Sequence, residues 1–220
     1  FTGTQVKRVS LPDTMEEVKG YAFAACTSLV TIDFGKGIAK IGERAFEGCT
    51  SLEAVALPES ITSLGEYSFY ECSGMNTLAI GDGVITIPYG AFMWCTSLST
   101  IEFGEQVQEI GTGAFGRCES LATLELPQSL TILGEWAFEH CTSLTEVIVP
   151  DSVTAVYSAV FSHCSALERV VLSLSLETVG DDIFNKTALT DLTLPNTGVI
   201  IDYLPETVKT IRLHGDAKGF

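Results

Sequence analysis

The fold is decided by the stretch Ile41-Gly42-Glu43-Arg44-Ala45-Phe46-Glu47-Gly48-Cys49-Thr50-Ser51-Leu52, copies of which recur along almost the whole chain. Phenylalanine recurs every 23 residues from Phe23 to Phe184, and cysteine recurs at the same interval from Cys26 to Cys164. A fixed period of about 20 to 50 residues is typical of stacked-repeat proteins, in which each unit buries its apolar face against its neighbours. The sequence therefore predicts a solenoid whose coils share one continuous core.

The unbroken period indicates a single domain. Residues 1–195 are expected to form the repeat array. Residues 196–220 depart from the period, and terminal repeats are commonly atypical because they present a polar outer face. We expect them to form a shortened terminal repeat or a C-terminal cap of the same domain. Because the chain begins at Phe1 in mid-pattern, we also expect it to be a piece of a longer protein.

Each repeat is predicted to contain a strand, a corner and a short turn of helix. Val55 and Leu57 alternate with alanines, which is the period of a half-buried strand, and Pro58 ends it because proline has no N–H to donate. Residues 66–72 are predicted to form a helical turn that places Phe69 and Cys72 on one face. Equivalent parallel strands should centre on Val9, Ile32, Val55, Leu78, Ile101, Leu124, Val147, Val170, Leu192 and Ile211.

The charge balance excludes two classes of partner. The formal net charge is -16, from 28 acidic and 12 basic side chains. Nucleic acids and anionic membranes both need clusters of lysine and arginine, and the sequence has none. No apolar run approaches the roughly 18 residues that a membrane-spanning helix needs. We therefore expect neither nucleic-acid binding nor membrane insertion, and we attribute the acidity to solubility in preference to steering of a basic partner.

The seven cysteines suggest neither zinc nor disulfides. In a zinc site four ligands meet at one point, whereas evenly spaced cysteines form a row that brings no four of them together. Disulfides need side chains that point toward each other, whereas stacked side chains point in parallel. We expect buried reduced thiols that fill space. His140 and His163 are also one period apart, but inward cysteines leave them outward, so no designed metal site is expected, although stacked surface histidines can pick up adventitious zinc.

The sequence also predicts no catalytic site and no cofactor. No serine lies in a G-x-S-x-G setting, and neither a phosphate-binding loop nor a dinucleotide glycine fingerprint occurs. The carboxylate pairs Glu16-Glu17 and Asp181-Asp182 look like solvated turn residues without an apolar pocket to raise their pKa. We therefore do not expect an enzyme.

The repeat unit closely resembles the BspA-like type of leucine-rich repeat, with the pattern L-x-x-I-x-L-P-x-S-V-T-x-I-G-x-x-A-F-x-x-C-T-S seen at residues 121–143 with conservative changes. The resemblance covers nearly the whole chain. It implies an α/β solenoid, an arc with a parallel β-sheet on the concave side and short helical turns on the convex side. It also implies a secreted or cell-surface location and a role as an adhesin or host-protein binder.

The leading hypothesis is a non-catalytic extracellular recognition module that binds a protein, with a host surface protein as the candidate partner, through the concave sheet face. The acidic side chains and exposed aliphatics of that face suit a basic and apolar protein segment. The candidate residues are Thr77, Thr100, Glu102, Thr123, Glu125, Glu146, Ile148, Arg169 and Val171.

Two alternatives remain open. A carbohydrate-binding adhesin would bind a glycan through convex aromatics, of which Trp94 and Trp136 are the candidates, because aromatic rings stack on sugars. A passive structural stalk of a larger surface protein would bind nothing.

Overall fold

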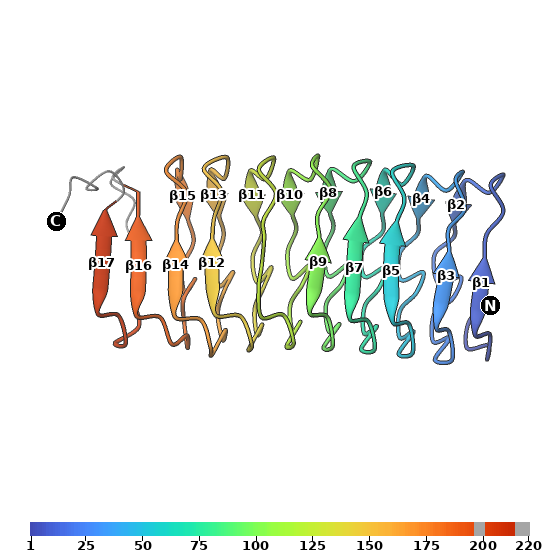
Figure 1. The fold of residues 1–220 in the computed structure, drawn as a ribbon, viewed down its shortest axis with the longest axis horizontal. Coiled ribbons are helices and arrows are strands. Elements are labelled where there is room, and N and C mark those ends of the chain that lie inside the picture. Colours follow the sequence, from blue (N-terminus) through green and yellow to red (C-terminus); the bar gives the residue numbers. More distant parts are fainter. Residues whose placement is uncertain (196–200, 214–220) are drawn as a thin grey trace.

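The fold is known from a computed structural model, which describes residues 1–195 and 201–213. In these residues the coils stack in a single row, from β1 at the right of Figure 1 to β17 at the left, and every strand pairing is parallel. Partners in neighbouring coils are mostly one repeat apart, as in the pairing of Ala54 with Thr77. The predicted solenoid with a parallel sheet is confirmed.

The longer strands form the main row. They are β1 (Arg8–Ser10), β3 (Thr31–Asp33), β5 (Ala54–Leu57), β7 (Thr77–Ile80), β9 (Thr100–Glu102), β12 (Glu146–Ile148), β14 (Arg169–Val171), β16 (Asp191–Leu194) and β17 (Thr210–Leu213). Each predicted strand centre except Leu124 lies in one of them. In the middle of the row, outward side chains alternate with buried ones, as in β5, where Val55 and Leu57 are buried and the alanines are exposed.

A second row of two-residue strands runs along the upper part of Figure 1, and sequence analysis did not predict it. It contains β2 (Glu17–Val18), β4 (Lys40–Ile41), β6 (Ser63–Leu64), β8 (Thr86–Ile87), β10 (Glu109–Ile110), β11 (Ile132–Leu133), β13 (Ala155–Val156) and β15 (Thr178–Val179). The second residue of each of these strands faces the core, as at Leu64, whose side chain is buried. A run of two residues is too short to show the alternation that marks a strand.

The predicted helical turns on the convex side are wrong, because the described residues contain no helix. Two positions in every turn have a left-handed backbone, with φ between 52° and 69°, which a right-handed helix cannot include. The first turn position is Tyr21, Arg44, Tyr67, Gly90, Gly113, Trp136, Ala159 and Asp182, and the second is Ala25, Gly48, Glu71, Trp94, Arg117, His140, His163 and Lys186.

Backbone hydrogen bonds show what replaces the helix. Along each turn, successive N–H groups donate in alternation to two kinds of acceptor. One lies in the same coil, as for the N–H of Glu47 and Arg44 O, and the other lies in the next coil, as for the N–H of Phe46 and Ser68 O. Every turn is therefore tied to its neighbour along the row. Gly65 is required here for space, because a Cβ would overlap the backbone nitrogen of Glu43 in the adjacent coil.

A ladder of phenylalanine rings forms the centre of the core. From Phe23 to Phe138, successive rings are stacked with centroids 5.0–5.4 Å apart and planes within 9° of parallel. The seven cysteines lie buried beside them as free thiols, as predicted. Each Sγ also lies within hydrogen-bonding distance of the backbone oxygen of a phenylalanine in the preceding coil, as from Cys95 to Phe69 at 3.3 Å. The ladder of rings thus continues as far as Phe184.

At the C-terminal end, β17 pairs with β16 and extends the main row by one strand. The proposed cap at residues 196–220 falls partly outside the described residues, which here are 201–213. Within the described ranges, no helix has the length and apolarity needed to cross a membrane.

Candidate functional site

The candidate partner-binding residues lie on the strand face, which we define as the outward side chains of the main row and of the segment 121–127 that continues it. The alternation of the strands turns these side chains away from the core. Val171 is half-buried, and the others are exposed: Thr77, Thr100, Glu102, Thr123, Glu125, Glu146, Ile148 and Arg169. The structure therefore places the whole candidate set on one accessible surface.

The main row is divided between β3 and β5 and again at residues 121–127, where one coil forms no main-row strand. The sheet β5–β7–β9 ends before this segment, and the sheet β12–β14–β16–β17 begins after it. One cause is charge, since Glu125 follows Glu102 by one repeat and stacked carboxylates oppose pairing.

A depression of about 470 Å³ opens on the strand face at this interruption. Its lining includes four of the candidate residues, Thr123, Glu125, Glu146 and Ile148. Ile148 is 58% exposed, so the lining of the depression includes an accessible apolar side chain. The structure thus brings Glu125 and Ile148 together in one depression. In the sequence, only their outward positions in the repeat made them candidates.

The charges of the strand face are more balanced than the sequence suggests. From the sequence, Glu102, Glu125 and Glu146 were three acidic candidates on this face. In the structure, Glu146 forms an ion pair with Arg169 of the next strand, with Oε1 and Nη1 3.3 Å apart. Glu102 and Glu125 form no ion pair within the described residues, so the uncompensated negative charge lies on the N-terminal side of the depression.

The two candidate tryptophans lie on the turns and differ in exposure. Trp136 is 44% exposed at a first turn position. Trp94 is half-buried at a second turn position, and the guanidinium of Arg117 lies 4.5 Å from its ring centroid. A ring already covered by a cation offers less surface to a sugar. Of the two tryptophans, Trp136 is therefore the more accessible to a sugar ring.

Four of the buried thiols are poor nucleophiles and poor metal ligands. Burial raises the pKa of Cys95 to about 12 and raises the pKa of Cys72, Cys118 and Cys141 well above the usual value. Since the thiolate is the reactive form, thiols that stay protonated at neutral pH neither attack substrates nor bind metals. Their role is structural.

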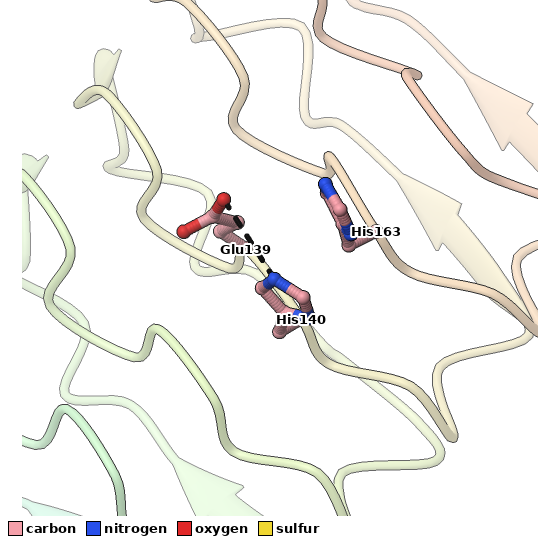
Figure 2. Close-up of side chains that lie close together, drawn as sticks. All are labelled: Glu139, His140 and His163. Carbon is pink, nitrogen blue, oxygen red and sulfur yellow. Dashed lines mark ion pairs between the residues drawn. The ribbon is translucent and has the colours of Figure 1, made fainter.

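The two histidines are half-buried and lie against one another. The ring centroids of His140 and His163 are 4.1 Å apart, with planes tilted by 32°. Burial, with further effects of Arg117 and His163, lowers the pKa of His140. Glu139 lies beside them (Figure 2), with its Oε1 4.0 Å from Nε2 of His140. Sequence analysis did not include Glu139, although it immediately precedes His140 in the chain.

Solved structures with the same fold come from several bacteria. A leucine-rich repeat protein from Bacteroides ovatus aligns over 95% of this chain with a TM-score of 0.72 and 23% identity. A leucine-rich repeat protein from Eubacterium ventriosum aligns over 89% with a TM-score of 0.70 and 22% identity. A leucine rich cell surface protein from Faecalibacterium prausnitzii aligns over 96% with a TM-score of 0.57 and 24% identity. The chain spans only 54%, 46% and 61% of these proteins, respectively.

Similarity at the sequence level agrees with the fold. No curated protein matches the sequence. The family model for the BspA type leucine rich repeat region matches residues 1–93 and 85–205, which together cover most of the chain. The stacked coils, the phenylalanine ladder and this match lead to one conclusion: the chain belongs to the BspA-type leucine-rich repeat family.

Proposed function

We propose that this chain is a non-catalytic recognition module that binds a protein segment at the depression on the strand face. The observation that supports this proposal is the coincidence of the interrupted sheet, the depression of about 470 Å³ and four candidate residues at one place. Clefts that combine apolar surface with a few polar groups are the usual form of a binding site.

The lining indicates the chemistry of the partner. Ile148 offers an aliphatic contact, and Glu125 offers an exposed carboxylate in the same depression. Glu146 is already paired with Arg169 and so is less available to a new cation. The partner that fits is a protein segment with an apolar side chain next to a lysine or arginine, where the cation contacts Glu125.

The rigidity of the site supports recognition. The site lies on a row of coils tied together by parallel strands and by backbone hydrogen bonds between the turns. A preformed surface loses little conformational entropy on binding, so a modest number of contacts suffices for affinity. A location outside the cell is part of the proposal, and one structure with the same fold is described as a leucine rich cell surface protein.

A displayed library of random peptides tests the proposal. The immobilised chain should enrich sequences that pair a basic residue with an apolar one. The double variant Glu125→Gln with Ile148→Ser should weaken binding of the enriched peptides by about tenfold or more, because both contacts are lost. The matched control is Asp33→Asn with Ala56→Ser, which changes exposed residues of the same face outside the depression and should leave binding unchanged.

The alternatives give different results in the same comparison. Equal binding by the double variant and the control would contradict a site at the depression. Binding to a glycan array that is lost in Trp136→Ala and kept in the double variant would favour the carbohydrate-binding adhesin. A chain that enriches no peptide and binds no glycan would favour the passive stalk.

A further inference from the structure

Three side chains with metal-binding atoms meet on the turns of two neighbouring coils. Glu139 and His140 come from one turn, and His163 comes from the next (Figure 2). One carboxylate oxygen and one nitrogen from each imidazole all lie within 4.8 Å of one another. The three residues are half-buried, so they are partly shielded from water and still accessible to an ion.

The fold holds these residues in place independently of any ion. His140 and His163 occupy the second turn position, with φ of 59° and 62°. The N–H of His140 donates to Ser162 O at 2.9 Å, and the N–H of His163 donates to Asn185 O at 2.7 Å. The carbonyl oxygen of Glu139 accepts from the N–H of Arg117 at 2.7 Å. Because the backbone is fixed on both sides, an ion would need only side-chain rotations to bind.

We propose that Glu139, His140 and His163 bind a divalent transition-metal ion of the zinc class and clip the two coils together. A tetrahedral ion with ligands at about 2.0–2.2 Å requires donor atoms about 3.4 Å apart, so donor atoms that lie within 4.8 Å must approach one another by at most about 1.4 Å. Two imidazoles and one carboxylate suit zinc, cobalt, nickel and copper ions, whereas calcium and magnesium prefer oxygen ligands alone. The fourth ligand would be water.

The position of the site gives the ion a structural effect. The clip would join the coil of Phe138 to the coil of Phe161, whose ring centroids are 6.0 Å apart, against 5.0–5.4 Å between the preceding rings. A metal bridge between these coils would stabilise the folded array, since the ion binds the native state in preference to the unfolded one. This inference is independent of partner binding at the strand face.

Calorimetric titration with ZnCl2 under reducing conditions tests the site. We expect one ion per chain with a Kd in the low micromolar range or tighter. Zinc at a hundredfold excess over Kd should raise Tm by about 5–10 °C, and EDTA should reverse the shift. With Co2+ in place of zinc, the absorption spectrum should lack a thiolate charge-transfer band, because the seven thiols are buried.

Variants separate this site from other ligands in the chain. His163→Gln should abolish binding and the Tm shift, and Glu139→Gln should weaken binding by at least about tenfold, since even loss of a partner that only supports a ligand commonly costs that much. The matched control is His214→Gln, which removes the third histidine of the sequence and should bind as the parent does. Millimolar affinity in the parent, unchanged binding in His163→Gln, or a thiolate band with Co2+ would each overturn the proposal.

Discussion

The phenylalanine ladder is tight over most of the molecule and wider at its C-terminal end. Ring centroids are 5.0–5.4 Å apart from Phe23 to Phe138, but 6.0 Å apart between Phe138 and Phe161 and 6.4 Å between Phe161 and Phe184. The coils differ in the residue before the phenylalanine. It is small in the tight region, as at Ala114 and Ala137, and larger in the wide region, at Val160 and Ile183.

We attribute the wider spacing to the larger residues before Phe161 and Phe184. Val160 and Ile183 are buried in the core, as Ala114 and Ala137 are, so their additional methyl groups occupy space between coils. Interiors are close-packed, and added volume therefore moves neighbouring groups apart. A small residue before the ring thus allows neighbouring rings to stack closely.

The thiol ladder changes in the same region. Cys164 contacts Phe138 O of the preceding coil through Sγ at 3.2 Å. In the next coil Thr187 takes the place of cysteine, and its hydroxyl donates to Phe184 O of its own coil at 2.9 Å. The last rung therefore lacks the sulfur contact between coils, and its ring also lies farther from the preceding ring.

The largest expected effect is the loss of a ring from the tight region. Phe92→Ala should lower the free energy of unfolding by about 4 kcal/mol, because the ring is fully buried and stacked on both sides. Phe184→Ala should cost about 1 kcal/mol less, since its ring stacks at a longer distance on Phe161. Urea unfolding of both variants measures the difference, and equal losses would contradict the comparison.

Alkaline pH tests the thiols of the tight region. Burial raises the pKa of Cys95 from the usual 9.0 to about 12, so the unfolded chain loses this proton first as pH rises. The free energy of unfolding should fall by about 1.4 kcal/mol per pH unit between these values for this thiol, and should be unaffected by it below pH 9. Between pH 8 and pH 10, Cys95→Ala should therefore lose about 1.4 kcal/mol less than the parent in reducing buffer. An identical loss would show that Cys95 does not titrate as expected.

Val160→Ala should be unusually mild for a core truncation. Removing the two methyl groups lets the adjacent coil approach, so the cost should be about 1 kcal/mol or less. The control is Val153→Ala at a fully buried position that does not precede a ladder phenylalanine, where about 2 kcal/mol is expected. Thermal unfolding of the two variants provides the measurement. If Val160→Ala loses more free energy of unfolding than Val153→Ala, Val160 fills a gap between coils whose spacing has another cause.

The smallest effect is expected on the strand face. Glu146→Gln removes an exposed ion pair with Arg169 and should change the free energy of unfolding by less than about 1 kcal/mol. Both partners are largely solvated, and salt should reduce the effect further. A loss above 2 kcal/mol in urea unfolding would assign this pair a structural role that its exposure does not support.

The repeat period predicted the coils, the main strands and the buried ladder, because one apolar residue per period must meet its equivalent in the next coil. The turns were predicted wrongly. Gly48, Gly90 and Gly113 mark left-handed positions, but Tyr21, Trp94 and His140 occupy equivalent positions without such a signal in the sequence. Tertiary hydrogen bonds to the next coil hold these residues in a conformation that their own preferences oppose.

The candidate site was predictable only in part. Alternation placed Glu125 and Ile148 on the outward face, as the structure confirms. The depression was not predicted, because it depends on the failure of residues 121–127 to pair in the main row, to which repulsion between Glu102 and Glu125 contributes. The contact of Glu139 with the two histidines depends on turn geometry and was therefore also missed.

A crystal structure of Ala114→Val tests most directly the claim that a small residue before each ring sets the spacing of the coils. Ala114 precedes Phe115, whose centroid is 5.3 Å from that of Phe92. The account predicts that this distance increases toward the 6.0 Å seen between Phe138 and Phe161, where valine precedes the second ring. An unchanged distance of 5.3 Å, with the valine accommodated elsewhere, would contradict it.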